Sequence, residues 1–189
     1  MQKKDPVTRG SEKGEAPSGF ASGGGRREPP KMDIEKRLRE FKILLPEFEP
    51  PIGNYLPTLR VGNLVFVSGQ LPKVDGRISY KGRIGRESRL ETGQLAARAC
   101  IVNALAALKA ELKDLNKIKR IIQVRGYVAS AIGFTDHHKV IDAASTLLVD
   151  LFGDAGKHAR AAVGVVDLPL GASVEIEMIV EVKGSLKDL

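Results

Sequence analysis

Hydrophobic and polar positions along this chain follow two different periods, and the change of period predicts the elements. Apolar residues recur at three-, four- and seven-residue steps over Arg86–Leu112 and again over Phe134–Phe152, which predicts two amphipathic helices. Gly153 stands where the second helix is expected to end. The apolar run Leu64–Val67, bounded by turn residues, predicts a buried strand. A polar turn over Lys73–Arg83 then leads to a second short extended piece.

Three more strands are predicted further along the chain, over Ile118–Ala129, Ala161–Val166 and Val174–Val182. In the last of them apolar residues alternate with Glu175, Glu177 and other polar positions, so one face is apolar and the other acidic. That acidic face could meet water or another subunit. The predicted order is β-β-α-β-α-β-β, an α+β domain with two helices packed on one face of a mixed sheet.

Residues 1–31 differ from the rest of the chain in composition. They are rich in Gly, Ser and Pro and poor in apolar side chains, so we expect a disordered tail with neither a signal peptide nor a strong transit peptide. The single folded domain is then expected over 32–189. It begins with a helical extension over 32–51, in which Asp33 is expected to cap a short helix at Ile34–Phe41.

The net charge of +7 invites a nucleic-acid hypothesis. Seven basic and four acidic residues fall in 1–31, however, so the other residues carry only about half of that charge, without a basic cluster. Aromatic residues make up 5% of the chain, too few for base-stacking platforms. We therefore expect no nucleic-acid partner. No apolar stretch reaches 18 residues, so we expect no membrane partner either, and a cytoplasmic location.

Few residues offer conventional catalytic or metal chemistry. His137, His138 and His158 lack metal-ligand spacing and are expected to be solvated polar residues, so no metal site is predicted. Cys100 lies on the strongest helix pattern and is expected to be a small buried hydrophobe. The chain also lacks a P-loop and a Gly-x-Ser-x-Gly elbow, which excludes the common NTPase and hydrolase machinery.

Arg160 lies in sequence surroundings that are unusual for a charged side chain. It begins a strand of small apolar residues, where an unpaired charge is costly, so it must reach the surface or find an anion. Its planar guanidinium suits a carboxylate. Glu175 and Glu177 point to one side of the following strand, and spacing alone favours a structural Arg–Glu pair.

Three segments nevertheless resemble signatures of one known family, the YjgF/RidA family, also called the endoribonuclease L-PSP family. They are Val-Gly-Asn-Leu-Val-Phe-Val-Ser-Gly-Gln-Leu-Pro at 61–72, Ala-Arg-Ala-Ala-Val-Gly at 159–164 and Leu-Pro-Leu-Gly-Ala-Ser-Val-Glu-Ile-Glu at 168–177. The helix over 34–45 and the segment 153–160 look like a bacterial branch of the family. The resemblance implies a chorismate-mutase-like fold of the bacillus type, assembled as a homotrimeric barrel with ligand sites between subunits.

The resemblance also implies roles for individual residues. Arg160 matches the arginine that binds the substrate carboxylate, and Glu175 matches the glutamate that positions or protonates through water. Three further positions are implied to line or close the pocket, Ser68, Gly69 and, from the neighbouring subunit, Tyr55. Ala162 stands where active members often carry Cys, which changes the shape of the pocket. No cofactor is implied.

Three functions are compatible with these observations. The resemblance implies a cofactor-free deaminase that hydrolyses reactive enamine and imine intermediates to 2-oxo acids and ammonia. The departure at Ala162 favours instead a trimer that binds a small carboxylate metabolite without turnover, in a regulatory role. The alternative family name suggests an endoribonuclease. We rank this function last, because the charge distribution offers no basic cluster to bind RNA phosphates.

Overall fold

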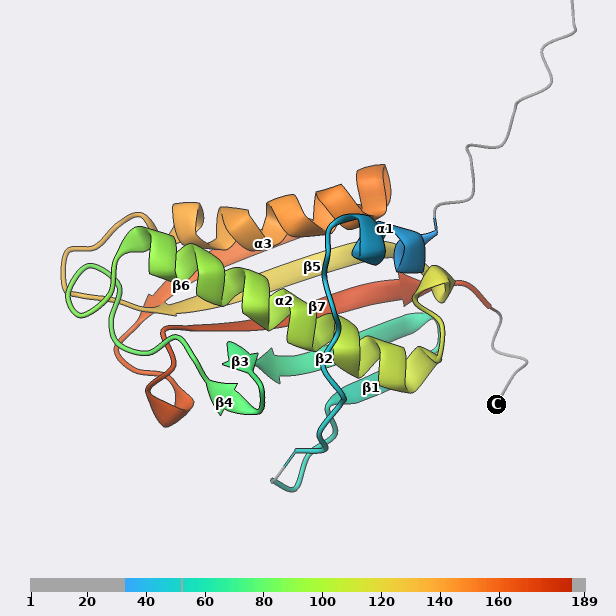
Figure 1. The fold of residues 1–189 in the computed structure, drawn as a ribbon, viewed down its shortest axis with the longest axis horizontal. Coiled ribbons are helices and arrows are strands. Elements are labelled where there is room, and N and C mark those ends of the chain that lie inside the picture. Colours follow the sequence, from blue (N-terminus) through green and yellow to red (C-terminus); the bar gives the residue numbers. More distant parts are fainter. Residues whose placement is uncertain (1–32, 52, 185–189) are drawn as a thin grey trace, which may run out of the picture. The chain divides into compact units, whose positions relative to one another are not determined.

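The computed structural model describes residues 33–51 and 53–184, so the prediction for 1–31 lies outside the described residues. A five-stranded sheet has the order β1-β2-β7-β5-β6, and a two-stranded hairpin, β3 and β4, stands apart from it (Figure 1). The strands are β1 Thr58–Val61, β2 Leu64–Gln70, β3 Lys73–Val74, β4 Arg77–Ile78, β5 Ile118–Ala129, β6 Ala159–Val165 and β7 Val174–Val182. Within the five-stranded sheet β5 and β6 pair in parallel and the other neighbouring strands pair antiparallel, which confirms the mixed sheet.

Two long helices, α2 (Leu90–Leu112) and α3 (His137–Phe152), lie on the same side of the sheet, as Figure 1 shows. Their apolar stripes and the inward side chains of the strands form one core, in which a fully buried Leu or Ile contributes about 1.5–3 kcal/mol. A third, short helix, α1 (Ile34–Glu40), packs against α3. Short 3₁₀ turns follow at Leu115–Lys117, Gly153–Gly156 and Pro169–Gly171.

The predicted helix ends are partly confirmed. Asp33 caps α1 by accepting a hydrogen bond from the backbone N–H of Lys36 at 3.1 Å, and Gly153 ends α3 with φ of 57°. Helix α2 begins at Leu90, four residues later than predicted. The reason is a tight turn in which the carbonyl of Arg83 accepts from the N–H of Ser88, so those residues cannot be helical.

The prediction that the whole run Leu64–Val67 is buried is wrong for one face of strand β2. Val65 and Val67 are buried, but Phe66 between them is 40% exposed, because successive side chains point to opposite faces of the sheet. The apolar run is therefore not buried on both sides. The alternation predicted for β7 is confirmed, with Val174 and every second residue after it buried.

The face of the sheet away from the helices carries both apolar and charged side chains. Phe66, Leu59 and Val61 are exposed there at the β1–β2 end. The predicted row of glutamates meets neighbouring cations, since Glu177 pairs with Arg125 at 2.9 Å and Glu181 with Lys119 at 2.8 Å. Among the described residues, no helix is long and apolar enough to cross a membrane.

Candidate functional site

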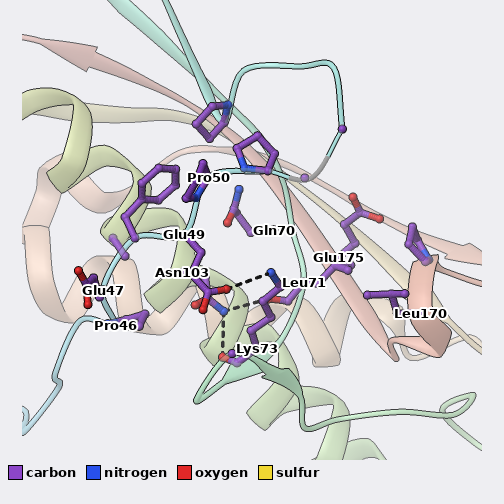
Figure 2. Close-up of a pocket in the computed structure, with 18 of the residues that line it drawn as sticks. Pro46, Glu47, Glu49, Pro50, Gln70, Leu71, Lys73, Asn103, Leu170 and Glu175 are labelled. Carbon is purple, nitrogen blue, oxygen red and sulfur yellow. Dashed lines mark hydrogen bonds and ion pairs between the residues drawn. The ribbon is translucent and has the colours of Figure 1, made fainter.

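A pocket of about 350 Å³ lies where the segment after α1 meets the ends of β2 and β7 (Figure 2). One wall is the proline-rich segment 46–51, and Glu175 and Leu170 stand on the opposite side. The remaining lining residues come from the segment 53–57, from the end of β2 and the hairpin after it, and from α2 and the 3₁₀ turn before β7. Elements distant in sequence thus form one concave site.

The proline-rich wall is held in place by α1. The backbone N–H of Ile34 donates to Asn116 Oδ1 at 2.8 Å, and Arg37 Nε donates to the carbonyl of Asp150 at 3.1 Å, near the end of α3. A cationic side chain is favourable at a helix C-terminus. The chain then crosses α2 as an extended segment, because Pro46 and its following prolines oppose helix (Figure 1).

Asn103 fixes the part of the pocket formed by the loop after β2. This side chain projects from α2 and donates through Nδ2 to the carbonyls of Leu71 and Lys73, each at 3.0 Å, as the dashed lines in Figure 2 show. The loop after β2 is thereby tied to a rigid helix. Asn103 was not predicted as a site residue, although an amide side chain on an otherwise Ala-rich helix is a signal of such a contact.

Glu175 and Gly69 meet inside the pocket. The side chain of Glu175 lies so close to Gly69 that a Cβ added at Gly69 would be 1.9 Å from Oε1 and 2.8 Å from Cδ. Only a residue without a side chain allows the carboxyl group to lie there. The structure thus brings together two of the residues assigned from the sequence, and it supplies the physical reason for the glycine.

Burial raises the pKa of the Glu175 carboxyl group above its ordinary value, and the nearby charge of Glu177 adds to this effect. The carboxyl group of Glu175 forms no hydrogen bond or ion pair within residues 33–51 and 53–184, unlike those of Glu177 and Glu181 on the same strand. A half-buried carboxyl group with a raised pKa exchanges protons more readily near neutral pH, as a general acid or base requires.

Gly69→Ala tests this close approach. We expect the methyl group to displace the flexible carboxyl end of Glu175 by about 1 Å, which lowers turnover about 10²-fold. The fold should persist, because the backbone at Gly69 lies outside the left-handed region. Turnover and thermal unfolding measured on the same preparation check both statements. Unchanged turnover would contradict the placement of Glu175.

Glu175→Gln tests the raised pKa through stability. The native state of the wild type holds the Glu175 proton more tightly than the unfolded state does, so this group stabilises at low pH and loses that contribution as the pH rises through its native pKa. We therefore expect the free energy of unfolding of the Gln variant to rise relative to that of the wild type as the pH increases from the ordinary glutamate pKa through the raised native pKa. Denaturant titrations at several pH values measure the difference, and a pH-independent difference would contradict the assignment.

Tyr55 and Ser68 occupy different positions at the pocket edge. Tyr55 lines the pocket with 56% of its surface exposed, so its ring stands at the mouth. Ser68 is not among the lining residues. Its Oγ donates to the carbonyl of Leu56 at 2.7 Å and its N–H donates to that of Pro57 at 2.9 Å. Ser68 thus fixes the turn that carries Tyr55.

Arg160 lies away from this pocket. It pairs in register with the buried Val124, so its side chain points toward the helices, and β5 separates β6 from β7. Its ion pair is with Asp142 of α3 at 2.5 Å. The predicted structural Arg–Glu pair is wrong, because spacing along the chain gives no information on which strands are adjacent.

Ala162 follows Arg160 on the same side of β6, half-buried against the core. One copy of the chain therefore presents two separate groups of residues assigned from the sequence. Tyr55, Gly69 and Glu175 line the pocket, and Arg160 with Ala162 lies on the edge strand.

Two of the three histidines differ from the prediction of solvated side chains. His138 is exposed, but His137 bonds Ser130 Oγ at 3.0 Å, and half-buried His158 bonds Ser145 Oγ at 3.1 Å. Cys100 is fully buried as predicted, and burial raises the pKa of its thiol well above the ordinary value. Such a thiol is a poor nucleophile.

The chain is similar to one family of proteins and to several of its members. Residues 35–182 match the family model described as "YjgF/chorismate mutase-like, putative endoribonuclease". A crystal structure of a protein of unknown function from Agrobacterium tumefaciens is 47% identical, with a TM-score of 0.74 over 79% of this chain and 94% of that one. Protein TCP17 of Trypanosoma cruzi is 38% identical over 78% of this chain and 93% of its own length. A 2-iminobutanoate/2-iminopropanoate deaminase of Dermatophagoides farinae is 29% identical over 75% and 95%.

Proposed function

This chain belongs to the YjgF/chorismate mutase-like family, and from that premise we propose that it is a cofactor-free hydrolytic deaminase of reactive enamine and imine intermediates. The products are a 2-oxo acid and ammonia. The observation that carries the proposal is the unpaired carboxyl group of Glu175, held against Gly69 in the pocket with a raised pKa. The deaminase of Dermatophagoides farinae supports the reaction class.

The proposed active site is shared between two copies of the chain in a homotrimer. Arg160 lies on the edge strand β6, apart from the pocket, so a second copy must supply it if it is to meet a ligand beside Glu175. The exposed apolar side chains on the open face of the sheet, Leu59 and Val61 among them, are surface that such an assembly would bury.

The chemistry needs only proton transfer and orientation. The enamine takes up a proton at carbon and becomes an iminium ion, whose carbon accepts the oxygen of water as that water gives up a proton. Nitrogen then gains a proton and leaves as ammonia, while the new hydroxyl group gives up its proton to water or to Glu175 and the C=O bond forms. Glu175 can move these protons through bound water, which is general acid–base catalysis. The guanidinium of Arg160 holds the substrate carboxylate bidentately and so fixes the reacting carbon.

The direct test is hydrolysis of 2-aminoacrylate, generated in place by a pyridoxal-phosphate dehydratase. We expect the protein to accelerate pyruvate release above the rate in buffer. Equal rates with and without the protein would overturn the proposal. This experiment reports on the reaction itself, independently of how the two copies are arranged.

A second function is favoured by one departure from the pattern. Ala162 replaces the Cys often found in active members, so the trimer could hold a small carboxylate without turnover. Calorimetry with 2-oxobutanoate, serine, glycine and benzoate separates the two functions. Saturable binding without acceleration of pyruvate release would favour the binding protein.

A further inference from the structure

Arg160 is held by a chain of hydrogen bonds that extends from β6 into α3. Its Nη1 donates to Asp142 Oδ1 at 2.5 Å and to Ser145 Oγ at 3.1 Å. Ser145 Oγ in turn lies 3.1 Å from His158 Nε2, and His158 Nδ1 lies 2.6 Å from the carbonyl oxygen of Gly156. Five residues from one helix, one strand and one turn thus form a continuous network.

The direction of every bond in this network follows from its two ends. The carbonyl of Gly156 can only accept, so Nδ1 of His158 carries the proton and, in the neutral ring, Nε2 is an acceptor. Ser145 then donates its hydroxyl proton to Nε2, which turns the oxygen lone pairs toward Arg160. Burial lowers the pKa of His158, which favours the neutral ring that this arrangement needs.

Both side-chain hydrogen bonds of Arg160 use the same nitrogen, Nη1. An Nη nitrogen carries two N–H groups, so Asp142 and Ser145 occupy Nη1 completely. Nε and Nη2 make no bond to any other residue in the described part of the chain. These two nitrogens form the side-on edge with which a guanidinium grips a carboxylate in two parallel hydrogen bonds. The Arg160 side chain as a whole is 26% exposed.

We propose that Asp142, Ser145 and His158 are positioning residues that hold the guanidinium of Arg160 with its Nε–Nη2 edge free as a preformed fork for a carboxylate. The inference rests on the proposed function in one respect, the identity of the ligand that the fork binds. Preorganisation of this kind improves affinity, because the guanidinium loses less rotational freedom when the ligand arrives. Catalysis stays with Glu175, so the three residues affect binding more than turnover.

The first arm of the test measures the guanidinium itself, without ligand. Arginine labelled with ¹⁵N is observed by NMR in the full-length protein, and Arg160→Lys identifies the Arg160 signals. We expect slow rotation of this guanidinium in the wild type, and rotation at least about tenfold faster in Asp142→Ala and Ser145→Ala. Asp142→Asn keeps an acceptor oxygen and should restore slow rotation. Asp136→Ala, which removes another exposed acid of the same region that pairs with Lys139, is the matched control.

The second arm measures affinity for 2-oxobutanoate and the kinetics of 2-aminoacrylate hydrolysis. We expect Ser145→Ala and His158→Gln to weaken binding by about 5- to 10-fold and to raise KM, with kcat within about twofold of the wild type. Asp136→Ala should change neither quantity. Weaker binding with kcat retained supports the positioning role, which a general loss of structure would not produce.

The two arms separate the inference from the proposed function. Equally fast rotation of Arg160 in the wild type and in Ser145→Ala would overturn the positioning role, whatever ligand binds. Unchanged affinity in the variants of a wild type that does bind would overturn it as well. A guanidinium that rotates slowly in the wild type, in Asp142→Asn and in the control Asp136→Ala, but fast in Asp142→Ala and Ser145→Ala, supports the positioning role. Absence of 2-oxobutanoate binding in that same wild type would count against the proposed function alone.

Discussion

Glu175→Gln is expected to lower kcat for 2-aminoacrylate hydrolysis by about 10²- to 10⁴-fold, the range that general acid–base catalysis contributes. The amide has nearly the shape of the carboxyl group, so it fits against Gly69 without the clash that a Cβ at Gly69 would cause. It cannot take up or release the proton that water addition requires. Binding of 2-oxobutanoate should therefore stay within about threefold of the wild type.

Glu177→Gln is the matched control for that experiment. Glu177 lies two residues further along β7, is paired with Arg125 and is not among the residues that line the pocket. The same chemical change there should leave kcat within about threefold of the wild type. Equal losses in the two variants would mean that the acidic face acts as a whole, and would contradict a specific role for Glu175.

Arg160→Ala is expected to weaken binding of 2-oxobutanoate by about 10- to 100-fold, because a bidentate, charge-assisted contact contributes about 1.5–3 kcal/mol. The variant also leaves Asp142, which is 59% exposed, without its partner, at little cost in stability since an exposed carboxylate is hydrated. The midpoint of thermal unfolding should therefore change little, although the affinity for 2-oxobutanoate falls.

Arg160→Lys distinguishes a carboxylate fork from a simple positive charge. Lysine retains the charge but has no planar pair of donors, so we expect an affinity between those of the wild type and the Ala variant. Calorimetry on the three proteins gives the comparison. An Ala variant that binds as tightly as the wild type would show that Arg160 serves only the ion pair with Asp142.

The elements of the fold were predictable from sequence wherever one periodicity governs a long stretch. Strand β5 has the predicted bounds, and α3 ends where Gly153 was expected to stop it. The predictions were wrong where contacts with other segments decide the local structure. The start of α2 is displaced by a turn closed through Arg83, and Phe66 faces outward because the pleat of the sheet overrides the uniform hydrophobicity of its run.

The candidate site was predictable only in part, since it depends on which distant segments become neighbours. The proximity of Gly69 and Glu175 follows from the pairing of β2 with β7, which no spacing rule gives. The partner of Arg160 proved to be Asp142, because β6 lies beyond β5 at the sheet edge and beneath α3. The wall over 46–51 was missed because prolines signal extended chain without indicating what that chain covers.

The central claim is that one copy supplies the pocket with Glu175 and a second copy supplies Arg160. Subunits carrying Arg160→Ala and subunits carrying Glu175→Gln, co-expressed and purified as mixed assemblies, test it most directly. At 2-aminoacrylate concentrations well below KM each variant alone should be nearly inactive, whereas random mixing should restore about a quarter of the wild-type sites, those with both residues intact. Mixed assemblies, verified by native mass spectrometry, that remain as inactive as the single variants would contradict the shared site.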